Sequence, residues 1–339
     1  MITIPRRQIL TSMAAALALP ATGLCAGERL RFATLAPRGS VYHRVLLEVG
    51  EAWRRATGAD AGFTVYTDGV QGDEADVVRR MRIGQLNGAM VSVVGLSEIE
   101  PGVTALQFMP LMFRSWEEVD AASQRLRPLL EKRISERGFV VLYWGEAGWV
   151  RFFSRTPCVR PADFQSLKMF SWSGSPAQVD LMRSLGYRPV VLETADILPG
   201  LQTGLIEAVP VLASFALAAQ IDAVAPHMLD MRWVPIVGAA VITRQAWDGM
   251  TPAAQQAVRQ ASLRAAATMR TERERSDQGA VDAMRARGLH VHTLTPEAQA
   301  EWQQLIAGAY PRIRGGMVPA DVFDLVQQSL ADFRSGRSA

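Results

Sequence analysis

Short apolar segments alternate with amphipathic helical segments along most of the chain, beginning at Glu28. A strand is expected at residues 30–35. After the turn that follows it, Val45, Val49 and Trp53 recur at helical spacing and mark one buried helix face. A helix between two buried strands returns the chain to the same edge of the sheet, which makes the sheet largely parallel. The pattern therefore predicts an α/β fold with mainly parallel sheets flanked by helices.

The alternation falls into two sets that are separated near residue 149. In the first set, strands are expected at 30–35, 63–66, 89–94 and 139–144. In the second set, strands are expected at 149–154, 167–171, 189–192 and 206–211, and a further strand is expected at 237–243. We therefore expect two lobes. Residues 28–149 plus 237–275 form lobe one, and residues 150–236 plus 276–339, with the C-terminal helices, form lobe two.

One helical pattern runs without a break from Thr251-Pro252 to about Arg287. Threonine is a good N-cap and proline suits the first helical position, while Gly288 is a suitable stop. A helix of this length is unusual in a globular domain. We expect it to brace both lobes.

The first 26 residues differ from the rest of the chain. Arg6 and Arg7 precede an apolar run that ends at Leu24, with small residues after it, which is the pattern of a removable signal peptide. The run is shorter than the ~20 residues of a spanning helix. The paired arginines suit the twin-arginine route, and the ordinary export route stays open. We expect cleavage after Ala26 and a soluble protein in a Gram-negative periplasm.

Charge and cysteine content exclude several classes of protein. The sequence has 36 Lys and Arg against 33 Asp and Glu, and removal of residues 1–26 takes away two arginines, so the mature balance is 34 − 33 = +1. No basic run suggests binding to nucleic acid. Cys158 would have no intrachain partner after cleavage, and we expect an inert thiol that is buried or half-buried.

Signatures of catalysis and of cofactor binding are missing from the sequence. It contains no G-x-S-x-G, H-E-x-x-H, Walker or G-x-G-x-x-G motif. His290 and His292 alternate on a short expected strand and share one face, which predicts a solvated face rather than a weak metal site, while His227 stands alone. We therefore predict no enzymatic activity, no metal and no cofactor.

Four phrases occur in an order that resembles the extracytoplasmic solute-binding proteins of tripartite ATP-independent periplasmic (TRAP) transporters. They are Phe-Ala-Thr-Leu-Ala-Pro at 32–37, Gly-Val-Gln-Gly-Asp-Glu at 69–74, Phe-Met-Pro-Leu-Met-Phe at 108–113 and Leu-Gln-Thr-Gly-Leu-Ile-Glu at 201–207. The resemblance implies a two-lobed periplasmic-binding-protein fold. It also implies a receptor that captures a small molecule between its lobes and delivers it to TRAP-type membrane subunits. We expect a monomer without cofactors.

The chain departs from that family where a ligand carboxylate would bind. Many members place an arginine, which forks onto the carboxylate, at the position of Phe170. A second arginine position falls on Val150, while the neighbouring Arg151 would point to the opposite face. A polar stretch of the family is replaced by the apolar residues 208–212. These changes predict an apolar or aromatic solute that is held mainly by burial.

The predicted contacts combine apolar strand-end residues with a few polar groups. They are Ala36, Ser92, Trp144, Glu146, Val150, Phe170, Ser171, Trp172, Val209, Val211, Phe215 and Trp233. Two other functions stay open: a periplasmic carrier of lipids or other hydrophobic molecules that serves a different transport machine, and a hydrolase that uses a Ser/His/Asp set without a recognisable motif.

Overall fold

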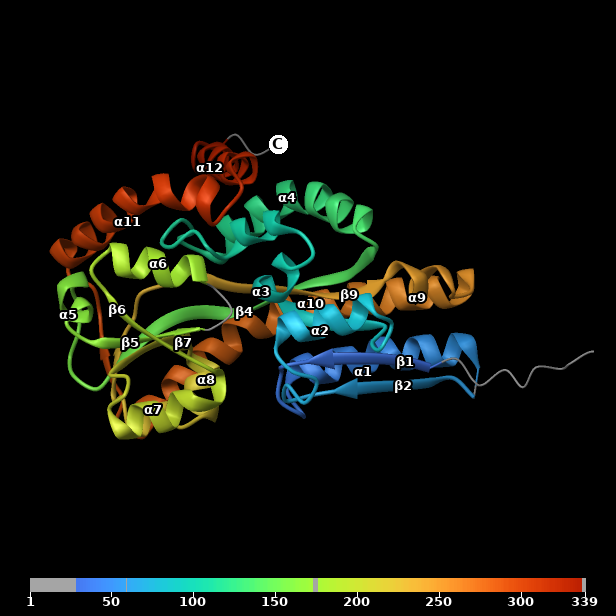
Figure 1. Cartoon of the computed structure of the whole chain (residues 1–339), viewed down its shortest axis with the longest axis horizontal. Coiled ribbons are helices and arrows are strands. Elements are labelled where there is room, and N and C mark those ends of the chain that lie inside the picture. Colours follow the sequence, from blue (N-terminus) through green and yellow to red (C-terminus); the bar gives the residue numbers. More distant parts are fainter. Residues whose placement is uncertain (1–28, 59, 173–175, 337–339) are drawn as a thin grey trace, which may run out of the picture.

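The computed structural model describes residues 29–58, 60–172 and 176–336, so the predicted signal peptide lies outside the described residues. The described chain forms an α/β fold around a mixed sheet, with helices on both sides (Figure 1). The strands follow the order β2-β1-β3-β9-β4-β7-β5-β6, and β8 and β10 extend from β4.

The strands lie close to the expected positions. They are β1 (Arg29–Thr34), β2 (Gly62–Tyr66), β3 (Gly88–Ser92), β4 (Phe139–Ser154), β5 (Lys168–Trp172), β6 (Arg188–Leu192), β7 (Ala208–Leu212), β8 (His227–Leu229), β9 (Pro235–Thr243) and β10 (His290–His292). Pairs toward both ends of the sheet are parallel, as predicted. In the middle, β9 runs antiparallel to β3 and β4, and β4 runs antiparallel to β7 and β8.

Twelve α-helices and three short 3₁₀ helices cover the sheet within the described ranges. The α-helices are α1 (Val41–Thr57), α2 (Glu74–Arg82), α3 (Val93–Ser97), α4 (Trp116–Glu136), α5 (Pro161–Gln165), α6 (Pro176–Ser184), α7 (Ile197–Thr203), α8 (Ala213–Ala218), α9 (Arg244–Asp248), α10 (Pro252–Ala286), α11 (Pro296–Gly316) and α12 (Ala320–Arg334). The 3₁₀ helices are η1 (Pro101–Leu106), η2 (Thr194–Asp196) and η3 (Ile221–Ala223). No helix in this part of the chain is both long and apolar enough to cross a membrane.

The prediction of two separate strands at 139–144 and 149–154 is wrong, because β4 is one strand of 16 residues. Its first part pairs with β9 and its last part with β7 and β8. Two shifts of register, between Val141 and Tyr143 and between Glu146 and Gly148, interrupt the pairing with β9. Gly148 has a φ of 137°, which side-chain-bearing residues rarely adopt. The strand therefore bends without ending, and it links the two parts of the sheet.

The expected long helix is present as α10, with 35 residues. The Thr251 hydroxyl accepts a hydrogen bond from the Ala254 amide at 3.2 Å, which caps the helix start. The helix packs against α1 at one end and α8 at the other, with β4 between them (Figure 1). The prediction of a helix that braces both lobes is thus confirmed.

The C-terminal helices divide between the two halves of the molecule. Helix α11 packs against α5 and α6, whereas α12 packs against α4 and η1 (Figure 1). Val322, Phe323 and Val326 of α12 are buried in the same core as Leu126 and Leu130 of α4. The expected boundaries assign all of residues 276–339 to lobe two, but α12 contributes to the core of the first half.

Buried ion pairs tie β4 to the long helix where the chain crosses between the two halves. Arg151 of β4 pairs with Asp277 of α10 at 2.6 Å and with Asp230 at 2.9 Å. Both the Arg151 and Asp277 side chains are 8% exposed. Because charges buried this deeply are strongly destabilised without a partner, the two side chains must stay together. The pairs therefore fix the position of β4 relative to α10.

Candidate functional site

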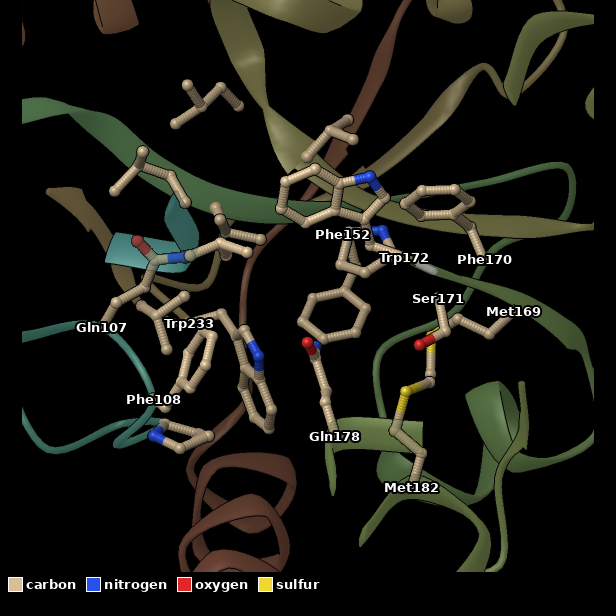
Figure 2. Close-up of a pocket in the computed structure, with 18 of the residues that line it drawn as sticks. Gln107, Phe108, Phe152, Met169, Phe170, Ser171, Trp172, Gln178, Met182 and Trp233 are labelled. Carbon is tan, nitrogen blue, oxygen red and sulfur yellow. The ribbon is translucent and has the colours of Figure 1, made fainter. Parts of the chain in front are cut away.

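A cavity of about 400 Å³ lies at the carboxyl ends of β5 and β7, a usual place for ligands in open α/β sheets. Its volume falls in the range of small-molecule sites. Phe170 and Trp172 line it from β5, and Val211 lines it from the end of β7. Figure 2 shows Phe170 and Trp172 at one edge of the cavity. The parallel pairing of β5 with both β6 and β7 brings these strand ends together.

Three aromatic rings from distant parts of the chain form a continuous wall. Phe152 of β4 contacts Trp233 in an edge-on arrangement, with ring centroids 5.2 Å apart. Trp302 of α11 lies 5.7 Å from Phe152 and 5.6 Å from Trp233. The Trp302 indole donates a hydrogen bond to the Val159 carbonyl at 2.9 Å, which fixes the ring. The wall therefore offers apolar faces in fixed positions.

Polar groups are few in this cavity, and some are already bonded. The Ser92 hydroxyl donates to the Glu74 carboxylate at 2.6 Å and accepts from the Val94 amide at 3.1 Å. Ser92 thus caps α3, although it also lines the cavity. By contrast, Gln107 Oε1 and Ser171 Oγ are buried and have no hydrogen-bond partner.

None of the described residues that line the cavity has a charged side chain. The nearest arginines and lysine in the sequence bond elsewhere. Arg151 pairs with Asp230 and Asp277. Lys168 donates to the Gly204 carbonyl, and Arg232 donates to the Arg114 carbonyl at 2.9 Å. Phe170 and Val150, the two positions where the resemblance implies an arginine in many members, both line the cavity.

Eight of the twelve predicted contact residues line this one cavity. They are Ser92, Val150, Phe170, Ser171, Trp172, Val211, Phe215 and Trp233. Their contact with a solute stays a prediction.

The other four predicted residues lie outside the cavity lining, for reasons of packing. Glu146 is 3% exposed and pairs with Arg127 at 3.1 Å and Arg273 at 3.4 Å. Trp144 donates to Glu131 at 2.8 Å and packs against Arg127.

Val209 lies opposite Phe153 in the sheet, where both are fully buried in the core. Ala36 is adjacent to Leu35, and Leu35 is the residue that lines the cavity.

Several lining residues were not predicted from the sequence. They include Gln107, Phe108, Phe152, Met169, Gln178, Leu181, Met182, Leu185, Tyr187, Trp302 and Ile306. Some local signals existed, since Phe108 opens one of the phrases typical of the family. The positions 178, 181, 182 and 185 also follow the spacing of one helical face. No local signal connects Trp302 to a cavity that lies mostly between residues 92 and 236.

The histidines correct one prediction. His227, expected to stand alone, lies beside both histidines of β10: its Nδ1 is 3.0 Å from His292 Nε2, and its ring stacks on His290 with centroids 5.1 Å apart. Burial and the two neighbouring imidazoles lower the pKa of His227. Within the described ranges, no group of three His, Cys, Asp or Glu side chains has an arrangement suited to a metal ion.

Cys158 is 3% exposed, and burial raises the pKa of its thiol. The Thr156 hydroxyl lies 3.9 Å from the sulfur. The thiolate, which is the nucleophilic form, is therefore disfavoured at this position.

Comparison with known proteins identifies relatives along most of the chain. The 2,3-diketo-L-gulonate-binding periplasmic protein of Escherichia coli is 23% identical over 283 residues, which cover 82% of this chain and 85% of that protein. The C4-dicarboxylate-binding periplasmic protein of Rhodobacter capsulatus is 22% identical over 200 residues, covering 58% of this chain and 60% of the relative.

Solved structures share the fold. A TRAP periplasmic solute-binding protein of a Sulfitobacter species, with bound β-D-galacturonate, has a TM-score of 0.80 at 18% identity and covers 89% of this chain and 100% of its own. One from Shewanella oneidensis, with bound succinate, has a TM-score of 0.81 at 15% identity and covers 90% of this chain and 100% of its own. The predicted two-lobed fold is confirmed.

The family described as bacterial extracellular solute-binding protein, family 7, matches residues 32–314. This match confirms the resemblance inferred from the four sequence phrases, and with it the role of a solute-binding receptor rather than an enzyme. Because the match spans most of the chain, this protein belongs to the bacterial extracellular solute-binding proteins of family 7.

Proposed function

We propose that this protein is a periplasmic receptor that captures an uncharged, largely apolar or aromatic solute and delivers it to TRAP-type membrane subunits. In this proposal the mature chain acts as a monomer after residues 1–26 have been removed. The observation that carries the ligand class is the absence of a charged side chain among the described residues that line the cavity.

The proposed solute differs in charge from the ligands bound in two solved structures of similar fold. The proteins similar in fold include one with bound β-D-galacturonate and one with bound succinate, and both ligands are acids. A carboxylate that enters a cavity without a cation loses its hydration, at an effective cost of several kcal/mol. In this chain Phe170 and Val150 occupy the positions where the family places arginines, and neither can offset that cost.

Apolar contact can supply the binding energy instead. Burial contributes about 25 cal/mol for each Å² of apolar surface, so a solute that buries about 200 Å² gains about 5 kcal/mol. Losses of translational and side-chain freedom reduce that gain, and the fixed aromatic wall of Phe152, Trp233 and Trp302 keeps the side-chain loss small. An aromatic or branched apolar solute fits these requirements.

Closure of the two lobes completes the proposed mechanism. The proposed lobes are residues 28–149 plus 237–275 and residues 150–236 plus 276–339, except that α12 packs into the core of the first lobe. The proposed hinges lie near Trp149 and Val237, where β4 and β9 are paired with Trp149 opposite Pro235. A bend at this pair, with the long helix α10 flexing to accommodate it, would bring the cavity walls together.

The test combines mass spectrometry of co-purified molecules with calorimetry. Protein isolated under native conditions is expected to release an uncharged solute, and succinate and galacturonate are expected to give no binding heat. Phe170→Arg is expected to weaken binding of the co-purified solute at least tenfold and to permit weak binding of acids, since it adds a cation to the cavity. Leu205→Arg adds the same charge at an exposed site and serves as the control. Tight binding of succinate or galacturonate to the unmodified protein would refute the proposed ligand class.

A further inference from the structure

Three side chains that line the cavity carry buried polar atoms without a hydrogen-bond partner. The atoms are Gln107 Oε1, Ser171 Oγ and the Tyr187 hydroxyl, and their residues are 8%, 2% and 7% exposed. Folded proteins rarely leave such atoms unpaired, because each one forfeits its bonds with water. Their presence in one cavity indicates that a molecule entering it forms these bonds.

The three atoms come from opposite sides of the cavity. Gln107 follows η1, in the half of the molecule that contains β1 and β3. Ser171 lies on β5 and Tyr187 immediately precedes β6, so both belong to the other half. Figure 2 shows Gln107 on one side near Phe108, Ser171 on the other near Met169, and Phe152 between them. The cavity therefore has a polar pole at each side, and Phe152 and the amide of Gln178 lie between the two poles (Figure 2).

The two poles differ in what they offer. Burial raises the pKa of the Tyr187 hydroxyl, so this group keeps its proton and acts as a donor. Ser171 shares the cavity with Met169 of the same strand, and its hydroxyl can also donate. The side-chain amide of Gln107 accepts through its oxygen and donates through its nitrogen, and Figure 2 shows the nitrogen on the side of Phe152. One pole thus suits a carbonyl or ether oxygen, and the other suits a hydroxyl group, which can both donate and accept.

The two polar poles restrict the solutes that the proposed receptor can bind. This inference rests on the proposed function. We infer that the solute is an uncharged molecule with a hydrogen-bonding group at each end of an apolar or aromatic body. The group at one end binds the Gln107 amide, the acceptor at the other end binds Ser171 and Tyr187, and the body packs against Phe152 and Trp233. Neither end is ionised, because the described lining supplies no counter-charge.

Three compounds that share one skeleton serve as probes of the complete mature protein. Cinnamamide has an acceptor at one end, 4-hydroxycinnamamide adds a donor at the other end, and cinnamate replaces the amide with a charge. By calorimetry, 4-hydroxycinnamamide is expected to bind about two- to tenfold more tightly than cinnamamide, which is the net effect of one neutral hydrogen bond. Cinnamate is expected to bind most weakly.

Conservative variants test which side chain of the protein binds each end of the probe. Gln107→Leu is expected to remove the advantage of 4-hydroxycinnamamide and to leave cinnamamide binding unchanged. Ser171→Ala and Tyr187→Phe are each expected to weaken both amides about two- to tenfold. Ser123→Ala is the matched control, because the Ser123 hydroxyl is also buried and unpaired but lies on α4, outside the cavity lining. It should change neither affinity.

The outcomes separate this inference from the proposed function. If both amides bind equally and no variant changes their affinity, the three atoms bond to water and the inference is wrong, while an apolar receptor remains. Failure of both amides to bind would also overturn the inference. If cinnamate binds more tightly than cinnamamide, the proposed ligand class itself fails, since a charge would then be favoured in the cavity.

Discussion

The ion pair between Arg151 and Asp277 gives the most demanding test of how β4 is held against the long helix α10. At the observed separation of 2.6 Å and an effective dielectric constant of about 20, their attraction is about 6 kcal/mol. The cost of removing two charges from water is of similar size. The attraction and the desolvation cost of the pair therefore nearly cancel, but the loss of one charge leaves the other buried and unpaired.

The variant Arg151→Met leaves the Asp277 carboxylate buried without its main partner. We expect a loss of about 3–5 kcal/mol in the free energy of unfolding at pH 8, measured by urea denaturation. The double variant Arg151→Met/Asp277→Leu removes both charges and is expected to lose about 1 kcal/mol or less. Asp277→Asn is expected to lose less than Arg151→Met, because Arg151 keeps Asp230 at 2.9 Å.

The pH dependence identifies the cause of the loss. Burial raises the pKa of the Asp277 carboxyl above its ordinary value, and the charge of Arg151 opposes that rise. A carboxyl whose pKa is higher in the folded than in the unfolded state makes folding less favourable as pH rises through the folded value. Without Arg151 the pKa of the Asp277 carboxyl rises further. The loss of unfolding free energy in Arg151→Met should therefore be smaller at pH 5 than at pH 8.

An exposed ion pair on α1 supplies the control, and two results would contradict the explanation. Arg54→Met breaks an exposed ion pair with Glu51 on α1 and is expected to leave the unfolding midpoint unchanged at either pH. If the loss in Arg151→Met is the same at pH 5 and pH 8, or if the double variant loses as much as Arg151→Met alone, an unpaired buried carboxylate is not the cause.

Three further predictions concern export, motion and the single mature cysteine. N-terminal sequencing should show that protein from the periplasm begins near Gly27, and a soluble product that retains Met1 would contradict the signal peptide. The substitutions Arg6→Lys and Arg7→Lys should block export only if the protein uses the twin-arginine route. Small-angle scattering should show a smaller radius of gyration with the co-purified solute bound, whereas an unchanged radius at saturation argues against closure. Because burial raises the pKa of the Cys158 thiol, a disulfide reagent at pH 8 should label it only after denaturation, and rapid labelling of the native protein would disprove this.

Several features of this protein follow from local sequence alone. The alternation of apolar strands and amphipathic helices predicted the α/β fold, and Thr251-Pro252 predicted the start of α10. Phe170, Trp172 and Val211 were predicted near the ligand because they stand at the carboxyl ends of adjacent strands. The fold and the helix start are confirmed, while contact of these three residues with a solute stays a prediction; periodicity, caps and strand ends can be recognised because they depend on residues that are close in the sequence.

The partners of individual side chains depended on tertiary structure. Glu146 was expected to offer a polar group to the solute, but Arg127 of α4 and Arg273 of α10 neutralise it in the folded chain. Trp302 and Gln107 reach the cavity from segments that are almost two hundred residues apart. A short sequence pattern states what a side chain can bond to, whereas only the packing of distant elements decides which partner reaches it and which polar atoms remain free for a solute.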